Sequence, residues 1–415
     1  MSRVTKAYSI ISTDALLLAV AVLSNPLTGV VSALAQDWTL TSAPNETWKC
    51  VVSSADGNRL AAFSYSLVYI STNSGISWIS NSLPSGALSC AAAASSADGS
   101  MLVAGDSCGG VYTSTNLGVT WITNNVPFGT WYGVASSADG SKLAAYSCYG
   151  NLFYTSTNAG MTWTTNGPPS TNIFTWCALA SSADGRKLVA AGTMSAKYPT
   201  HAGWIYTSTN SGAGWQMTTA PKTNWCSITS SADGCKLVAA AYDDYPFSDQ
   251  NGIFMSTNSG ATWTAINTPQ SLWRYITVAC STNGNNLIVA PGSYPGLIYT
   301  STDSGATWIS NNVPKTYWGS VASSAVGNKL AAAMYGGQIY TWQYKPTLWL
   351  SPSKTNLVVL WACSPFATNY VLQQNSDLSS ANWTATGLPV NNDGTNMGVT
   401  FGPLIGNNYF RLFHP

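Results

Sequence analysis

The sequence predicts an all-β protein: a seven-bladed β-propeller closed by an N-terminal strand, followed by a small C-terminal β-sandwich. Three repeated strings lead to this prediction. SSADG or a looser copy occurs seven times at intervals of 41 to 50 residues, and STNSGATW or a near copy occurs six times. A tryptophan followed six residues later by a proline occurs seven times in register. The glycines that end the SSADG-like strings are Gly57, Gly99, Gly140, Gly185, Gly234, Gly284 and Gly327.

Each unit is expected to hold four short strands. In the third unit these are residues 130–135 (TWYGVA), 142–146 (KLAAY), 151–156 (NLFYTS) and 162–166 (TWTTN). The Asp-Gly pair between the first two strands favours a tight hairpin, because glycine tolerates a positive φ. Four strands per unit of about 40–50 residues, repeated around a ring, is typical of propellers.

The first fragment of the ring explains why the repeat counts differ. Trp38 and Pro44 form the first Trp-x5-Pro pair, and no complete unit precedes them. The seventh SSADG-like copy, residues 323–327, is followed by a third strand but by no such pair. We expect the fragment at Trp38 to supply the fourth strand of the last blade, which removes two exposed sheet edges.

The eight-residue strings resemble the Asp-box pattern, Ser/Thr-x-Asp/Asn-x-Gly-x-Thr/Ser-Trp, of the bacterial-neuraminidase repeats in sialidase-like propellers. Copies include STNSGISW at 71–78, STNAGMTW at 156–163 and STDSGATW at 301–308. The resemblance covers about Trp38 to Trp342 and implies the fold. It says little of function, since related propellers include xyloglucan hydrolases, sortilin-type receptors and photosystem II assembly factors. We expect the motif residues to be structural, with the Asn or Asp capping a turn.

Strand alternation places the one-two and three-four turns on one face, here called the lower face, and the two-three and four-one loops on the other, the upper face. The upper loops vary in length, and variable loops on a rigid scaffold are where binding usually resides. Nine residues before each SSADG-like glycine lies an aromatic residue, except in the second unit, where Cys90 takes the position. These aromatic residues are Trp48, Trp131, Trp176, Trp225, Tyr275 and Trp318.

Two interpretations of these aromatic residues stay open: wedges packed between neighbouring blades, or a collar around the upper mouth that stacks a ligand. In the collar interpretation, the candidate binding site consists of these aromatic residues together with Tyr242 in a long two-three loop and Arg274 in a four-one loop. The leading functional hypothesis is a non-catalytic recognition or scaffold protein that binds a glycan or protein surface through the upper face. A monomer without a cofactor or a metal is expected.

Sialidase chemistry, as the resemblance implies it, needs three arginines around one carboxylate. The repeat region holds three arginines in all, Arg59, Arg186 and Arg274, and they are not expected on the same face. The first two follow lower-face turns, and one guanidinium cannot build the clamp. The alternative function is a glycoside hydrolase of another kind, which needs two carboxylates at a suitable separation. Upper-face candidates for such a catalytic pair are Glu46, Asp106, Asp243 and Asp244.

The chain ends add two further segments. Residues 1–35 have a basic start, an apolar run and a small-x-small site at Ala33–Ala35, which predicts a bacterial secretory signal and a secreted or cell-surface protein. Residues 36–345 form the predicted propeller. Residues 346–415 resemble immunoglobulin-like or fibronectin III-like modules, with strands expected at 357–361, 370–374, 397–401 and 409–413.

Charge and cysteine content bound the partners. With 16 Lys+Arg against 15 Asp+Glu, the chain has no basic excess for nucleic acid, and no segment after the signal is apolar for long enough to span a membrane. The nine cysteines permit disulfides in an exported protein, and their pairing stays open, with Cys108–Cys148 as the favoured pair.

Overall fold

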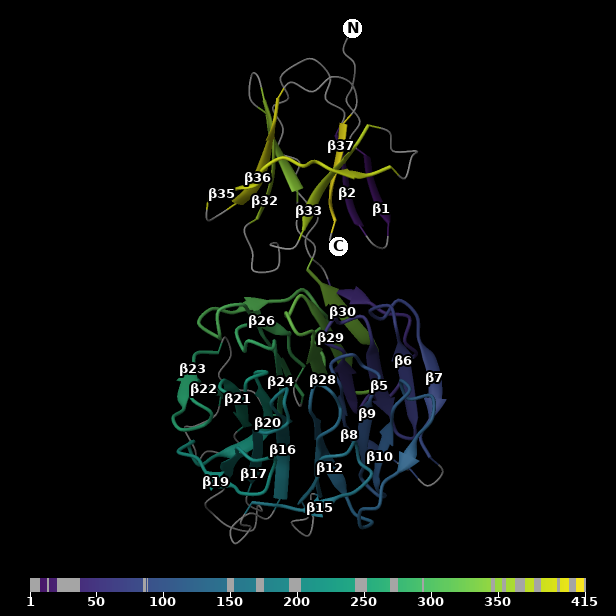
Figure 1. Cartoon of the computed structure of the whole chain (residues 1–415), viewed down its shortest axis with the longest axis vertical. Coiled ribbons are helices and arrows are strands. Elements are labelled where there is room, and N and C mark those ends of the chain that lie inside the picture. The colour runs from purple at the N-terminus through teal and green to yellow at the C-terminus, as the bar shows by residue number, and fades with distance from the viewer. Residues whose placement is uncertain are drawn as a thin grey trace. The chain divides into compact units, whose positions relative to one another are not determined.

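The computed structural model describes residues 8–12, 15–20, 38–84, 87, 89–147, 153–168, 175–193, 203–242, 252–268, 275–292, 295–344, 348–352, 356–362, 370–376, 382–393, 396–402 and 408–413. The chain divides into two compact units, one of residues 37–343 and one that joins residues 1–36 with 344–415. Every regular element in the described residues is a β-strand, which confirms the all-β prediction (Figure 1). No described helix is long and apolar enough to cross a bilayer.

Seven four-stranded antiparallel sheets are found in the described part of unit 37–343. Sheet 1 holds β4 (Cys50–Ser53), β5 (Leu60–Ser64), β6 (Leu67–Ser71) and β7 (Ile79–Ser82). Sheet 2 holds β8 (Cys90–Ser95), β9 (Leu102–Asp106), β10 (Val111–Ser114) and β11 (Ile122–Thr123). Sheet 3 holds β12 (Trp131–Ser136), β13 (Leu143–Ser147), β14 (Phe153–Ser156) and β15 (Thr164–Thr165).

The remaining sheets of this unit repeat the same order. Sheet 4 holds β16 (Thr175–Ser181), β17 (Leu188–Thr193), β18 (Trp204–Ser208) and β19 (Gln216–Met217). Sheet 5 holds β20 (Asn224–Ser230), β21 (Leu237–Tyr242), β22 (Gly252–Ser256) and β23 (Thr264–Ile266). Sheet 6 holds β24 (Ile276–Cys280), β25 (Leu287–Pro291), β26 (Tyr299–Ser301) and β27 (Ile309–Ser310).

Sheet 7 takes its fourth strand from the start of the unit. Its strands are β28 (Trp318–Ser323), β29 (Lys329–Met334), β30 (Ile339–Gln343) and β3 (Thr39–Leu40). β3 pairs with β30 through Thr39↔Thr341 and Leu40↔Tyr340, and the Thr41 N–H donates to the Ile339 carbonyl at 3.0 Å. The predicted pairing of residues near 40 with residues near 340 is therefore confirmed.

A circle of backbone hydrogen bonds joins the sheets near the SSADG-like turns. The residue two positions before each SSADG-like glycine donates its backbone N–H to the carbonyl of the equivalent residue in the next sheet. The N···O distances are 2.6–2.8 Å. The last bond runs from Ala325 of sheet 7 back to Ala55 of sheet 1, so that the circle closes. Its members in order are Ala55, Ala97, Ala138, Ala183, Ala232, Thr282 and Ala325.

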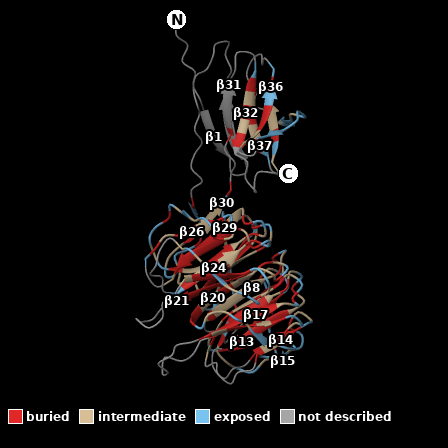
Figure 2. Ribbon diagram, turned by 90° about the vertical axis from the view of Figure 1, so that its left-hand side faces the viewer, coloured by how far each residue is buried: buried red, intermediate tan, exposed pale blue. Residues whose placement is uncertain are grey.

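Apolar side chains fill each junction between neighbouring sheets. The second strand of a sheet is buried on both faces, as in β13 and β21, because it lies inside the sheet and between two neighbours (Figure 2). One cluster joins sheets 1 and 2 through residues such as Phe63 and Leu102. Another joins sheets 7 and 1 through Trp48, Leu60 and Ile339, so the seam is packed like the other junctions.

Two sheets are found in the described part of the other unit. One holds β31 (Leu348–Pro352), β32 (Leu357–Ala362), β36 (Asn396–Phe401) and β35 (Asn391–Asn392), and the other holds β1 (Tyr8–Ser12), β2 (Ala15–Val20), β37 (Asn408–Phe413), β33 (Val371–Asn375) and β34 (Thr384–Ala385). Phe401 of β36 contacts Phe410 of β37, with ring centroids 4.9 Å apart. The four strands expected here are present within one or two residues. β1 and β2 lie in the segment for which a signal is predicted, and they extend the sheet at β37.

Candidate functional site

The lower face is built by pairs of turns that hydrogen-bond to each other. In sheet 1 the Ser74 N–H, in the three-four turn, donates to the Asn58 carbonyl in the one-two turn at 2.8 Å. Equivalent bonds join Leu117 to Ser100 and Ser304 to Asn285. On the opposite face, bridges such as Glu46↔Gly337 and Gly109↔Gly129 join a two-three loop to the following four-one loop. The predicted division into faces is therefore confirmed for these residues.

The eight-residue motif serves the fold. In sheet 1 the Asn73 Oδ1 accepts the Ser77 N–H at 2.9 Å, and the Ser71 hydroxyl accepts the Gly75 N–H at 2.8 Å. The Trp78 indole N–H donates to the Gly75 carbonyl at 3.1 Å. Gly75 has a φ of +89°, as expected, and Ser74 before it has a φ of +57°. All these groups are satisfied within one turn, so the motif offers no free ligand-binding group here.

Five of the six aromatic residues predicted for a ligand-stacking collar are inside the protein. Each has at most 1% of its surface exposed, so none presents a ring face to a ligand on the surface. The collar interpretation is wrong for them, because each ring fills the junction between two sheets. The five are Trp48, Trp131, Trp176, Trp225 and Trp318.

The contacts of these rings explain their burial. Trp48 lies edge-on to Tyr69 at 5.1 Å between ring centroids, and its indole N–H donates to the Gly337 carbonyl at 2.9 Å. Trp318 makes the same kind of bond to the Gly296 carbonyl at 3.0 Å. Trp48 and Trp318 thereby connect the start of one sheet to an upper loop of the preceding sheet.

Tyr275, the sixth member, remains on the surface. It is 51% exposed, and its ring stacks on Tyr242 with centroids 4.4 Å apart and an interplanar angle of 25°. The structure therefore brings together two of the predicted binding residues from sheets 5 and 6. Tyr275 also has a φ of +51°, an unfavourable conformation for a residue with a side chain. Arg274, the third member of this predicted group, lies outside the described residues.

A second aromatic group on the upper face was not predicted. Tyr65 and Tyr335 occupy the short two-three turns of sheets 1 and 7, and they are 49% and 56% exposed. The Lys49 ammonium lies 5.0 Å from the Tyr65 ring centroid and 5.1 Å from that of Tyr335. Tyr317, which is 44% exposed, accepts the Tyr335 N–H on its carbonyl at 2.8 Å. We call Lys49, Tyr65, Tyr317 and Tyr335 the seam cluster.

The sequence carried a weak signal for the seam cluster. Tyr65 and Tyr335 are single tyrosines in the turns SYS and MYGG, and no periodic pattern marks them because the other upper loops differ in length. Ring closure places sheets 1 and 7 side by side and thereby brings together Lys49 and Tyr335, which are 286 positions apart in the sequence.

The two described carboxylates proposed for hydrolysis, Glu46 and Asp106, are both held by hydrogen bonds to nearby groups. The Glu46 carboxylate accepts hydrogen bonds from the Ser64 hydroxyl at 3.1 Å and the Tyr69 hydroxyl at 3.3 Å. Burial, and then Glu46, raises the pKa of Tyr69 above its ordinary value. Asp106 is fully buried, and its Oδ1 accepts the N–H groups of Ser89 and Cys108 at 3.1 and 2.9 Å. Asp243 and Asp244 lie outside the described residues.

Comparison with known proteins establishes the fold but no family. No family model and no curated protein matches the sequence. Among solved structures, hydrazine synthase of Kuenenia stuttgartiensis matches with a TM-score of 0.59 and 14% identity over 75% of this chain and 99% of the other.

Two further structures match at the same level of identity. YCF48 bound to D1 peptide gives a TM-score of 0.54 and 14% identity over 78% of this chain and all of the other. The β-propeller domain of Myceliophteria thermophila Cps50 (Swd1) gives 0.57 and 14% over 75% of this chain and all of the other. At 14% identity these matches show a shared fold, and the chain contains a β-propeller.

Proposed function

We propose that the protein is a non-catalytic recognition protein that binds a partner protein through the upper face, at the seam cluster. In this proposal the seven sheets are the blades of one closed propeller of the sialidase-like, Asp-box type, and the C-terminal strands form an immunoglobulin-like sandwich. The supporting observation is three tyrosines, each more than two-fifths exposed, beside a lysine that lies over two of their rings.

The arrangement of these side chains favours a protein partner. Tyrosine is enriched at the centres of protein interfaces, because it buries a large ring and keeps a hydroxyl for hydrogen bonding. The Lys49 ammonium already occupies one face of two rings, which leaves their edges, their hydroxyl groups and the ammonium itself to a partner. A carboxylate on that partner would pair with Lys49. The neighbour described as YCF48 bound to D1 peptide gives a precedent for peptide binding on this fold.

A glycan ligand is the second candidate, and the stacked pair of Tyr242 and Tyr275 favours it. Tyr242 supports one face of the Tyr275 ring, and half of Tyr275 remains exposed. A supported, flat aromatic surface suits the apolar face of a sugar ring. This site lies on sheets 5 and 6, so substitutions can separate it from the seam cluster.

The experiment probes the full chain with a phage-displayed library of random short peptides and with a glycan array. Selected peptides are expected to carry Asp or Glu and to bind at least ten times more weakly after Tyr65→Ala plus Tyr335→Ala. Met161→Ala on the lower face is the matched control, because Met161 is 77% exposed and should not change binding. A glycan signal that disappears only with Tyr275→Ala would replace the protein partner by a sugar. No binding to either library would contradict the proposal.

The alternative of a glycoside hydrolase receives no support from Glu46 and Asp106. Glu46 accepts hydrogen bonds from Ser64 and Tyr69, and Asp106 has no exposed surface to offer a substrate. Hydrolysis of a polysaccharide that stops in a Glu46→Gln variant would nevertheless establish catalysis and would overturn the proposal.

We propose further that the protein is exported and cleaved after Ala35, so that it acts outside the cell or at its surface. The basic start, the apolar run and the Ala33–Ala35 site support this. Mass spectrometry of the mature chain should find Gln36 at its N-terminus. An intact Met1 on protein recovered from the culture medium or the cell surface would contradict cleavage.

A further inference from the structure

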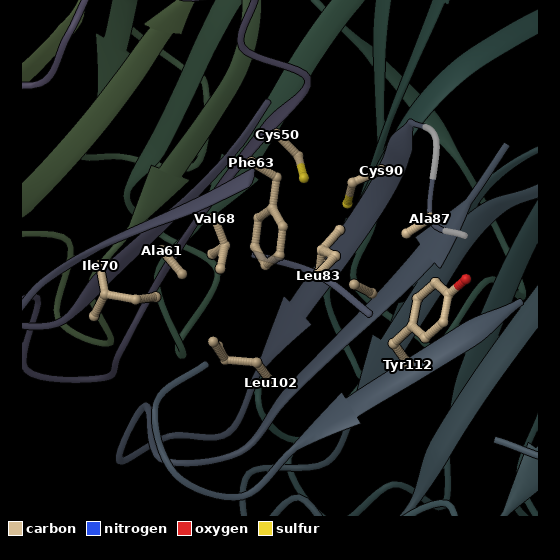
Figure 3. Packing of buried hydrophobic residues seen from close by; sticks show 11 residues of the cluster. Cys50, Ala61, Phe63, Val68, Ile70, Leu83, Ala87, Cys90, Leu102 and Tyr112 are labelled. Atoms are coloured by element: carbon tan, nitrogen blue, oxygen red, sulfur yellow. The ribbon is translucent and has the colours of Figure 1, made fainter. Parts of the chain in front are cut away.

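Two residues that break the repeat pattern meet at the junction of sheets 1 and 2. Cys90 stands where the other units have an aromatic residue, nine positions before the SSADG-like glycine. Cys50 stands seven positions before Gly57, where the other units have Ala, Gly, Ser or Thr. Both belong to one buried cluster, and Figure 3 shows their sulfur atoms turned toward each other from neighbouring strands.

The position of Cys50 in its strand explains why its side chain points toward sheet 2. In sheet 5 the equivalent residue, Ser227, accepts the N–H of Val278 in sheet 6 on its hydroxyl at 3.2 Å. In sheet 7 the equivalent Ser320 accepts the N–H of Val51 in sheet 1 at 3.1 Å. This position therefore directs its side chain to the first strand of the next sheet. For Cys50 in sheet 1, the next sheet is sheet 2, and its first strand β8 begins at Cys90.

The surroundings of the two thiols are closed and mainly apolar, with the buried Asp106 paired to Cys90 on the neighbouring strand β9. Cys90 has no exposed surface and Cys50 is 9% exposed, with Phe63, Leu83 and Ala87 packed around them. Burial, and then the neighbouring Cys50 thiol, raises the pKa of Cys90 well above its ordinary value. In the described residues no group of three His, Cys, Asp or Glu side chains is placed to hold a metal ion.

We propose that Cys50 and Cys90, which are free thiols in this structure, form a disulfide that links the first strands of sheets 1 and 2. The oxidant is a disulfide, carried by a thiol oxidoreductase or by oxidised glutathione. One cysteine thiolate attacks it and forms a mixed disulfide, and the second thiolate then displaces the oxidant. The two cysteines lose two electrons and two protons, and the oxidant is reduced to two thiols.

The bond forms during folding, before the cluster closes. Once the sheets have packed, the buried thiols cannot reach an external oxidant, and a finished disulfide is equally shielded from reductants. The link closes a loop of 41 residues, from Cys50 to Cys90 inclusive, and restricts the unfolded chain. It acts next to the seam, because sheet 1 also packs against sheet 7.

The test unfolds the full chain in guanidinium with a reductant and refolds it with oxidised and reduced glutathione. Free thiols are then blocked with N-ethylmaleimide under denaturing conditions, and the chain is digested without reduction. Trypsin cuts after Lys49 and Arg59, so Cys50 lies on its own short peptide, and a second protease separates Cys90 from Cys108. The expected product is the Cys50 peptide linked to the Cys90 peptide, with a melting temperature roughly 5 °C above that of the reduced protein.

Variants show whether the link is specific. Cys90→Ala should leave Cys50 blocked by N-ethylmaleimide, whereas Cys108→Ala should leave the linked peptide unchanged. Cys280→Ala is the control for loss of another buried thiol, because the Cys280 sulfur contacts Thr229 rather than a cysteine. N-ethylmaleimide on Cys50 in most refolded wild-type molecules, or a link from Cys50 to Cys108, would overturn the proposal. Peptide mapping of the wild type decides this even if a variant does not fold.

Discussion

At the scale of single residues, the repeated tryptophan of the first strand shows that a sequence repeat identifies a position in the fold but does not tell where the side chain points. A period of 41–50 residues located Trp131 and its counterparts correctly. It could not tell whether the rings face the mouth or the neighbouring sheet, because both are periodic features of a ring. Full burial of five rings settles the question in favour of packing.

Trp131→Ala is therefore expected to change stability, not ligand recognition. The substitution removes a fully buried indole that contacts Tyr154 and donates to the Pro127 carbonyl, and it should lower the free energy of unfolding by about 3–5 kcal/mol. Urea unfolding measures the change. Ile122→Ala is the control, because Ile122 is 63% exposed and should stay within about 0.5 kcal/mol of the wild type. Equal urea midpoints for the two variants would contradict the packing role.

The aspartates of the SSADG-like strings predict how stability depends on acid. The Ser96 hydroxyl, and then Ser100, lowers the pKa of Asp98 to about 2, and Ser137 and Ser141 do the same for Asp139. An unfolded aspartate titrates near pH 3.9, so this stabilisation is complete above about pH 4 and is lost as the pH falls toward about 2. Asp98→Asn should flatten the fall in melting temperature across this window.

The sixth unit offers the reverse substitution. Asn283 has the place of the aspartate there and accepts the same two hydrogen bonds, from Ser281 and from the Asn285 N–H. Asn283→Asp should steepen the fall in melting temperature between about pH 4 and pH 2. Unchanged slopes in both variants would show that these carboxylates do not contribute to the pH dependence.

At the scale of elements, strands and turns were predictable where local chemistry determines them. The Asp-Gly and Asn-x-Gly turns require positive φ, and Gly75 and Gly99 adopt it. A continuous apolar run located β32, and alternating apolar residues located β36 in the C-terminal unit. Ser74 at a φ of +57° was not predicted, because the motif names only the glycine. The seam cluster was missed for a different reason, since it depends on the meeting of two loops that are distant in sequence.

The three-four turn of sheet 1 supports the closing strand, and Gly75→Ala tests this. A Cβ at Gly75 would lie 2.9 Å from the Thr41 methyl and 3.1 Å from that of Thr341, and φ is +89°. The cost should be about 2 kcal/mol or more, measured by urea unfolding. Gly336→Ala is the matched control, because its φ is +74° but a Cβ there meets nothing within 4 Å. A Thr41→Ser background should restore part of the loss only for Gly75→Ala.

At the scale of the whole molecule, the closed circle was predictable because the repeat counts did not match. A fragment with Trp38 and Pro44 at one end and an incomplete unit at the other specify that the two ends pair. The sequence could not indicate the circle of backbone hydrogen bonds through Ala55 and Ala325. Backbone N–H and carbonyl groups are not specific to a residue type, so no sequence pattern marks those that form the circle. It also could not separate Cys50 and Cys90 from the other cysteines, since their approach requires the assembled junction.

Within sheet 7, the edge between β30 and β3 is held by hydrogen bonds alone, because the two strands come from opposite ends of the propeller segment, and Thr41→Pro tests the contribution of this pairing. The Thr41 N–H donates to the carbonyl of buried Ile339 at 3.0 Å, and proline removes that donor and leaves the acceptor without it. The free energy of unfolding should fall by about 1–3 kcal/mol. Thr41→Ala is the control, because it keeps the N–H and removes only the side chain.

Hydrogen exchange adds a readout that distinguishes opening of the seam from general loss of stability. In Thr41→Pro, amides of β30 and β29 should exchange faster relative to the wild type than those of β12 and β13, because β3 covers the edge of sheet 7 alone. Uniform acceleration in all sheets would mean that the ring opens only as a whole. If the proline and alanine variants unfold at the same urea concentration, the pairing of β3 with β30 contributes nothing to stability, and the ring is held by the packing of Trp48, Leu60 and Ile339 across the seam.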